Sequence, residues 1–129
     1  MANANSLPGK PVEWMGSSRK DIRECPDSVK DMFGYALDRA QRGATHPDAR
    51  PMKGALREVT EVVADAARAT FRAMYTVRFA GVVYVLHVFK KKSTRGIRTP
   101  QRELDVIAKR LAAAREHYDS HYSPPRPGS

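Results

Sequence analysis

The feature that most constrains the fold is an almost unbroken apolar stretch from Val82 to Phe89. Its residues are Val-Val-Tyr-Val-Leu-His-Val-Phe, and three lysines follow directly. Valine and aromatic residues favour strands, and a strand that is apolar on both faces is normally buried on both. We therefore predict a central strand over residues 82–90, in a sheet that is covered on its two faces.

Two similar stretches, over residues 56–63 and 70–79, precede this strand and are rich in valine, threonine, phenylalanine and tyrosine. Residues 65–69 link the first stretch to the second, and a tight turn at Ala80-Gly81 leads into the central strand. The three strands are therefore predicted to form an antiparallel meander. Residues 12–15 alternate apolar and polar side chains, which predicts one further short strand.

Two helices are predicted between the short strand and the meander, because capping signals precede apolar residues at helical spacing. Their boundaries are marked by Ser18 with Asp21, by Cys25-Pro26, by Asp27 or Ser28, and by Gly43. The second helix carries one apolar stripe, formed by Val29, Met32, Phe33, Ala36, Leu37 and Ala40. We expect this stripe to pack in the core.

A third helix is predicted near the end, with Thr99 as its cap and Pro100 at its first position. Its inward residues are predicted to be Leu104, Ile107, Ala108, Leu111 and Tyr118. The order of elements indicates an α+β fold with an antiparallel sheet, two N-terminal helices and a C-terminal helix. One domain is expected over residues 10–119, between disordered ends at 1–9 and 120–129.

The formal net charge is +9, and its distribution is more informative than its size. Residues 50–102 hold twelve basic side chains against three acidic ones, whereas the segments before and after are balanced. This concentration predicts a surface that binds a polyanion, with a solvated basic face that has no ligand as the alternative.

The sequence also favours a particular compartment. It contains no run of eighteen apolar residues, so no membrane-spanning helix is expected. Its first residues do not resemble a secretory signal, and the single cysteine, Cys25, cannot form an internal disulfide. We therefore expect a protein of the reducing cytoplasm.

The strongest local signal lies in residues 90–98, which contain five cations and no acid and therefore suggest a phosphate clamp. Alternation along a strand places Lys90 and Lys92 on one face and Lys91 on the other. The cations expected to bind RNA are Lys53, Arg57, Arg78, Lys90, Arg95 and Arg98. The alternative is that the lysines only protect a strand end against edge pairing.

The candidate catalytic residues are Arg72, His87, Lys91 and Lys92. Arg72 lies inside a predicted strand, on the face that also carries Arg78, where a charge is costly unless it is paired or functional. A structural ion pair with Glu61 or Glu103 is the alternative role for Arg72.

His87 is the candidate for proton transfer, because a histidine titrates near neutrality. A lone histidine in a core strand is, however, more often a structural residue. Tyr84 precedes His87 by three residues, so alternation predicts that the two side chains point to opposite faces.

No metal and no cofactor are expected. His117, Asp119 and His121 have a chelating spacing, but they lie close to the predicted disordered end. The motifs of zinc proteases, phosphate-binding loops and serine hydrolases do not occur in the sequence.

Several segments resemble the phage-derived, Gp49-like branch of the RelE/HigB-type toxins. They are Met52-Lys53-Gly54, Thr70-Phe71-Arg72-Ala73-Met74-Tyr75, and the stretch from Val83 to Ser93. Thr99-Pro100 and Glu103-Leu104 fit the start of the terminal helix of that branch. The resemblance runs from about residue 11 to about residue 118.

The resemblance implies a fold like that of microbial ribonucleases and a toxin that cuts messenger RNA, usually in the ribosomal A site. It implies metal-free attack of a ribose 2′-hydroxyl on phosphate, and an antitoxin, often a helix-turn-helix protein from the adjacent gene. The family's central-strand arginine falls on Arg72, and the variable active residues fall on Lys90, Lys91 and Lys92. Val63 stands where relatives frequently carry another arginine.

The main hypothesis is therefore a cytoplasmic mRNA endoribonuclease, the toxin of a type II toxin–antitoxin system. One alternative is a nucleic-acid-binding regulatory protein of phage origin that has no catalytic activity. Another is a toxin of the same fold that acts on a different target, such as gyrase.

Overall fold

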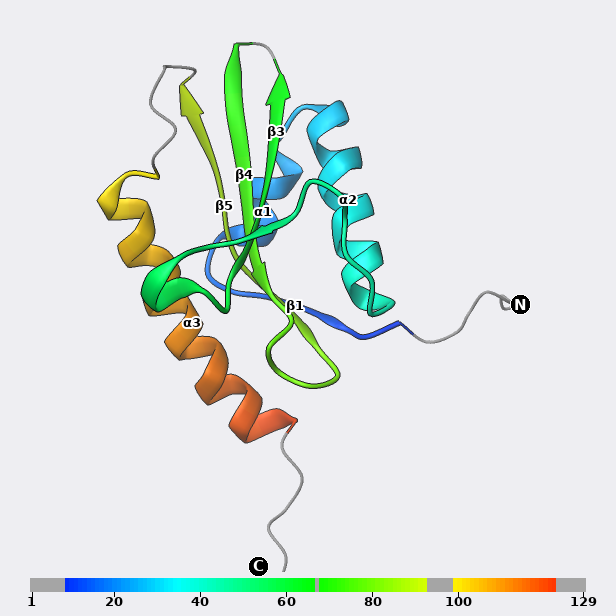
Figure 1. The fold of residues 1–129 in the computed structure, drawn as a ribbon, viewed down its shortest axis with the longest axis vertical. Coiled ribbons are helices and arrows are strands. Elements are labelled where there is room, and N and C mark those ends of the chain that lie inside the picture. Colours follow the sequence, from blue (N-terminus) through cyan, green and yellow to red (C-terminus); the bar gives the residue numbers. More distant parts are fainter. Residues whose placement is uncertain (1–8, 67, 93–98, 123–129) are drawn as a thin grey trace, which may run out of the picture.

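The computed structural model describes residues 9–66, 68–92 and 99–122, and at Lys92 the backbone only. It contains a five-stranded sheet with the strand order β1-β5-β4-β3-β2, flanked by α-helices (Figure 1). The elements are β1 (Val12–Trp14), α1 (Ser18–Arg23), α2 (Asp27–Gln41), β2 (Arg50–Pro51), the short 3-10 helix η1 (Gly54–Leu56), β3 (Thr60–Ala66), β4 (Ala69–Thr76), β5 (Val83–Lys92) and α3 (Gln101–His121). This architecture confirms the predicted α+β class.

The sheet is mixed rather than purely antiparallel. Strands β3, β4 and β5 form the predicted antiparallel meander. Strand β1, however, pairs with β5 in parallel, with Val12 opposite Val83, and the two-residue β2 extends the far edge along β3. The prediction of an antiparallel sheet is corrected at β1, whose partner is distant in the sequence and is not specified by any local pattern.

Strand β5 lies between two hydrophobic cores, as its apolar composition predicts. Helices α2 and α3 lie on opposite sides of the sheet (Figure 1). On one face, α1 and α2 pack on Val83, Val85 and Val88. On the other face, α3 packs on Tyr84 and Leu86. The apolar stripe of α2 is confirmed, because all its members are buried except Met32, which is partly buried.

The bounds of the meander strands differ from the prediction by one to four residues. Strand β3 starts at Thr60, because the chain before it forms η1, and β3 continues through Asp65 to Ala66. The link to β4 is therefore a tight hairpin, in which Arg68 has a left-handed φ of 64°, instead of a five-residue loop. Strand β4 ends at Thr76, so Arg78 lies outside the sheet.

The predicted helix caps are wrong by one or two residues. The N-cap residues are Ser17 for α1, Pro26 for α2 and Pro100 for α3, and none makes a side-chain capping bond. Ser18 is instead fully buried, and its hydroxyl donates to the Val85 carbonyl at 3.2 Å. A tertiary hydrogen bond therefore determines the role of Ser18, which a local capping pattern cannot reveal.

Helix α3 faces the core slightly differently from the prediction. It ends at His121, and the Tyr122 hydroxyl beyond it donates to Glu13, so the ordered domain continues past residue 119. Ala108 is exposed, whereas Ile107 and Ala114 are buried. The predictions of disorder at residues 1–8 and 123–129 lie outside the described residues. Within the described part of the chain, no helix is long and apolar enough to cross a membrane.

Candidate functional site

A β-bulge in β5 determines where His87 points. Tyr75 lies opposite Val85 and Met74 lies opposite His87, so Leu86 is an extra residue in the ladder. An extra residue shifts the alternation of side chains by one position. His87 therefore lies on the α3 side of the sheet, as Tyr84 does, and the prediction that the two point to opposite faces is wrong.

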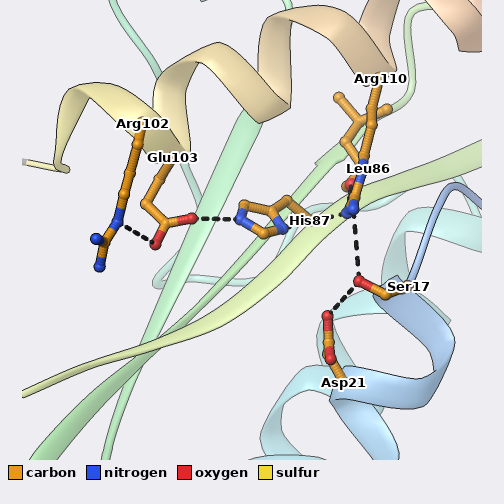
Figure 2. A network of polar contacts seen from close by, with 7 residues as sticks. All are labelled: Ser17, Asp21, Leu86, His87, Arg102, Glu103 and Arg110. Carbon is orange, nitrogen blue, oxygen red and sulfur yellow. Dashed lines mark hydrogen bonds and ion pairs between the residues drawn. The ribbon is translucent and has the colours of Figure 1, made fainter.

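The bulge places His87 in a network of polar side chains (Figure 2). Its Nε2 lies 2.7 Å from Glu103 Oε1, and its Nδ1 lies 3.2 Å from Arg110 Nη1. A guanidinium can only donate hydrogen bonds, so Nδ1 is the acceptor and Nε2 carries the proton that is donated to Glu103. The His87 imidazole is only 7% exposed, and these two bonds fix both its orientation and its tautomer.

Arg110 extends this network from α3 to α1. Its Nη1 also donates to the Leu86 carbonyl at 3.0 Å, and its Nη2 lies 3.4 Å from Ser17 Oγ, which donates to Asp21 at 2.7 Å (Figure 2). The guanidinium lies so close to Gly16 that a Cβ there would be 2.5 Å from it. Gly16 has a φ of 55°, which favours glycine, and a Cβ at this position would also force the Arg110 guanidinium to move.

Arg72 makes one of the ion pairs that were considered as alternatives to a phosphate clamp. Its guanidinium donates to Glu61, and the two side chains are 10% and 20% exposed. Arg72 lies opposite Val63 on β3 and opposite Phe89 on β5. The Glu61 carboxylate thus neutralises part of the positive charge that the sequence predicted for this face.

The register of β4 and β5 shows which lysines share a face with Arg72. Lys91 lies opposite Thr70, so Lys91 and Arg72 are on the α3 side, while Lys90 is on the other side, as alternation predicts. A pocket of about 340 Å³ at this end of the sheet is lined by Phe89, Lys90, Lys91, Pro100, Arg102 and Glu103. The backbone of Lys92 continues β5 and lies opposite Ala69.

The other predicted RNA-binding cations do not all gather at this end of the sheet. Lys53 is exposed and lines a neighbouring pocket of about 580 Å³ that shares Pro100 with the first. Arg57 is exposed just after η1. Arg78 lies beyond the opposite end of β4 and pairs with Glu58 at 3.3 Å, so it does not join the lysines. Arg95 and Arg98 lie outside the described residues.

Tyr84 and His117 form a second polar contact beneath α3. The Tyr84 hydroxyl lies 2.7 Å from His117 Nδ1, and the His117 ring stacks on His121 with centroids 4.0 Å apart. Burial, with a smaller contribution from the Glu13 carboxylate, raises the pKa of Tyr84 to about 12. Among the described residues, no group of three metal-ligating side chains occurs.

The sequence interpretation missed Arg110 entirely and considered Glu103 only as a partner for Arg72. Both lie on the face of α3 that contacts β5, since Glu103, Ile107 and Arg110 follow helical spacing and Ile107 is fully buried. The apolar stripe of α3 therefore contained a signal for them. The contact with His87 could not be foreseen, because it depends on the bulge.

The site thus combines a carboxylate–imidazole pair with cations on the same side of adjacent strands. The first could accept and pass on a proton, and the second could hold an anionic group. Carboxylates contact both Arg72 and His87, so the described site is less positive than the composition of residues 50–102 implies.

The sequence matches the family described as "Phage derived protein Gp49-like (DUF891)" over residues 20–112. No curated protein matches it significantly. A similar solved structure is the toxin–antitoxin complex RelBE2 from Mycobacterium tuberculosis, with 18% identity, a TM-score of 0.42, and coverage of 62% of this chain and 95% of that chain. The chain belongs to the phage-derived Gp49-like family, the branch of RelE/HigB-like toxins that its motifs resemble.

Proposed function

We propose that this protein is the toxin of a type II toxin–antitoxin pair and that it cleaves messenger RNA on the ribosome. The observation that carries the proposal is the placement of Arg72, His87 and Lys91 on the same side of β4 and β5, beside the start of α3. Membership in the Gp49-like family supports the toxin role.

The proposed reaction needs no metal and no cofactor. The 2′-hydroxyl of a ribose attacks the adjacent phosphorus, the bond to the 5′-oxygen of the next nucleotide breaks, and a 2′,3′-cyclic phosphate and a 5′-hydroxyl form. Arg72 and Lys91 stabilise the charge on the phosphate, and Lys53, Arg57, Lys90, Lys92, Arg95 and Arg98 hold the RNA. The His87–Glu103 pair accepts the proton of the attacking 2′-hydroxyl and returns a proton to the departing 5′-oxygen, which leaves as a hydroxyl.

The proposed partner is an antitoxin, a helix-turn-helix protein encoded by the adjacent gene. An acidic segment of this antitoxin covers the lysine end of the sheet, because such a segment both neutralises the charge and blocks the RNA. The pair is expected in the cytoplasm, where ribosomes and messenger RNA are available.

Controlled expression in bacteria tests the proposal. Wild-type protein should arrest growth and translation, and sequencing of RNA 5′ ends should show new 5′-hydroxyl termini within translated messages. His87→Ala and Lys91→Ala should each reduce cleavage by about 10²–10³-fold, because each removes one group that acts in the transition state. Lys109→Ala, which changes an exposed lysine on α3 outside the pockets, is the matched control and should retain activity.

A second candidate function is nucleic-acid binding without cleavage. The observation that favours it is that both Arg72 and His87 are already bonded to carboxylates. In that case the purified protein would bind RNA, but no new RNA ends and no growth arrest would appear. Induction of the DNA-damage response without mRNA cleavage would point instead to a toxin that acts on gyrase.

A further inference from the structure

The C-terminal part of β5 has an open edge. Strand β1 pairs with β5 only from Val83 to Val85, whereas β4 pairs with β5 on the other side as far as Lys92. In the part of the chain that the structure describes, no strand therefore lies beside β5 from Leu86 onward on the β1 side (Figure 1). Such an edge can accept a further strand through its backbone groups.

The bulge decides which backbone groups face this open edge. The Val83 N–H and the Val85 carbonyl each make a 2.9 Å hydrogen bond to the segment around β1, so both residues direct their backbone groups to that side. Because Leu86 is an extra residue, the alternation of backbone directions shifts by one position after it. The backbone N–H and carbonyl groups of Val88 and Lys90 therefore also point to the open edge. The side chains agree, since Val88 shares a core with Val83 and Val85.

A groove of about 420 Å³ follows this edge between α1 and the start of α3. Its apolar lining consists of Cys25, Phe71, Val88 and Phe89. Burial raises the pKa of the Cys25 thiol, so the thiol stays protonated and contributes as an apolar group. The groove therefore offers both an unpaired strand edge and an apolar surface on which a side chain of a further strand can pack.

The charged residues of the groove are mostly acidic, although the chain as a whole is strongly basic. Asp21, Glu24 and Glu103 line it, against the single positive side chain of Lys90 among the described lining residues. Asp21 accepts a bond from Ser17, and Glu24 makes an exposed pair with Lys20 at 3.2 Å, which leaves acceptor positions on both carboxylates. RNA phosphates are unsuited to this groove, whereas basic side chains complement it.

We propose that this edge groove binds an extended segment of a partner protein that adds a strand to β5 and carries alternating apolar and basic side chains. The apolar side chains pack on Phe71 and Val88, and the basic side chains contact Asp21, Glu24 and Glu103. The groove shares Phe89, Lys90 and Glu103 with the pocket at the end of β5, and His87 also lines it. Strand addition nevertheless does not depend on ribonuclease activity. A failure to cleave RNA would therefore leave this proposal standing.

A second copy of the same chain fits the edge less well. A second copy would bring its own Asp21 and Glu24 to the groove together with Lys90, so it complements the acidic lining less well than a segment whose charged side chains are all basic.

The test uses a designed ten-residue peptide in which valine alternates with lysine, with both ends blocked. Amide hydrogen exchange, followed residue by residue in the full-length protein, should show protection of Val88 and Lys90 when the peptide is added. A valine–glutamate peptide should bind the basic protein elsewhere and leave these two amides unprotected. A valine–lysine peptide with N-methylated backbone amides cannot pair with a strand and should give no protection.

A matched pair of variants tests the charge complementarity. Glu24→Lys should weaken binding of the valine–lysine peptide by about fivefold to tenfold, since it replaces an attraction by a repulsion of similar size. Asp31→Lys, which makes the same change on the exposed side of α2, should leave the affinity unchanged. The proposal is overturned if the N-methylated peptide binds equally well, or if both variants weaken binding equally. It is also overturned if gel filtration shows a dimer in which the β5 amides are protected without peptide.

Discussion

At the scale of single residues, the two main candidates for catalysis, Arg72 and His87, each contact a carboxylate. Arg72 pairs with Glu61, and His87 lies between Glu103 and Arg110. A buried pair of this kind is costly to break, because removing one partner leaves the other charge desolvated. The same contacts hold each side chain in one orientation, which a site for phosphate or proton transfer requires.

The Arg72–Glu61 pair gives the first prediction. Arg72→Ala should lower the free energy of unfolding by about 2–4 kcal/mol, because it leaves Glu61 without its cation in a mostly buried position. Urea denaturation is the measurement. Arg102→Ala, whose side chain is 86% exposed, should change stability by less than about 0.5 kcal/mol.

Glu61→Gln separates a structural role of Arg72 from a role in RNA binding. If Arg72 contacts phosphate, loss of the neighbouring anion should tighten RNA binding even though the protein becomes less stable. Weaker or unchanged RNA binding in this variant would leave Arg72 as a structural residue only.

Tyr84 gives a prediction about pH. Its pKa is raised to about 12 in the folded protein, so the unfolded chain loses this proton first as the pH rises above its ordinary value of 10. The stabilisation that depends on the neutral phenol is therefore complete below pH 10 and disappears by about pH 12. Melting curves should show a steeper loss of stability over this range in the wild type than in Tyr84→Phe, and parallel losses would contradict the assignment.

At the scale of elements, contacts between α1, β5 and α3 determine the geometry of the site. The bulge in β5 exposes the Leu86 carbonyl to Arg110 of α3, and the same guanidinium reaches Ser17 next to α1. One side chain thus joins two helices across the edge of the sheet (Figure 2). The position of His87 therefore depends on how α3 packs on β5 and not on β5 alone.

Two glycine substitutions test this junction. Both Gly16→Ala and Gly43→Ala place a Cβ at a left-handed backbone, with φ of 55° and 79°, which costs about 1–2 kcal/mol. Only Gly16→Ala also places the Cβ within 2.5 Å of the Arg110 guanidinium, whereas nothing lies within 4 Å at Gly43. Gly16→Ala should therefore destabilise the protein more in urea denaturation.

A double variant shows whether Arg110 causes the difference. In Gly16→Ala with Arg110→Ala, the two losses should be less than additive, because the steric conflict disappears with the guanidinium. Additive losses would mean that the contact between Gly16 and Arg110 is unimportant for stability.

At the scale of the whole molecule, a basic and an acidic surface adjoin at the end of β5. Lys90, Lys91 and Arg102 line the pocket where β5 ends and α3 begins. Asp21 and Glu24 lie on α1 beside the edge groove, which shares Phe89, Lys90 and Glu103 with that pocket. A molecule of this kind can contact a polyanion with one part and a basic segment with another. Arg78, beyond the remote end of β4, contributes to the net charge but lies away from the lysine cluster formed by Lys90, Lys91 and Lys92.

The salt dependence of RNA binding tests the lysine cluster. The logarithm of the affinity for single-stranded RNA should fall with the logarithm of the salt concentration, with a slope of about 0.7 per phosphate contacted. Lys91→Ala with Lys92→Ala should flatten this slope. Lys20→Ala with Lys109→Ala removes the same charge from α1 and α3 and should change the slope much less. Equal changes of the slope in the two double variants would place the RNA surface elsewhere.

Local patterns were enough to predict the α+β class, the meander, the stripe of α2, the burial of β5 on both faces and the placement of Lys90 and Lys91 on opposite faces of β5. These features depend on local periodicity, which a chain carries in its own order of residues. Even the turn at Gly81 was visible, and it has the positive φ of 83° that glycine permits.

The partner of β1, the caps, the side to which His87 points and the contacts of its ring depend on packing between distant segments. Strict alternation predicts that His87 and Tyr84 point to different faces of the sheet, but the extra residue Leu86 brings both side chains to the same face. Glu103 and Arg110 reach His87 from a helix that begins more than ten residues later. Such contacts form only when the sheet and α3 are packed together, so no local pattern in the sequence specifies them.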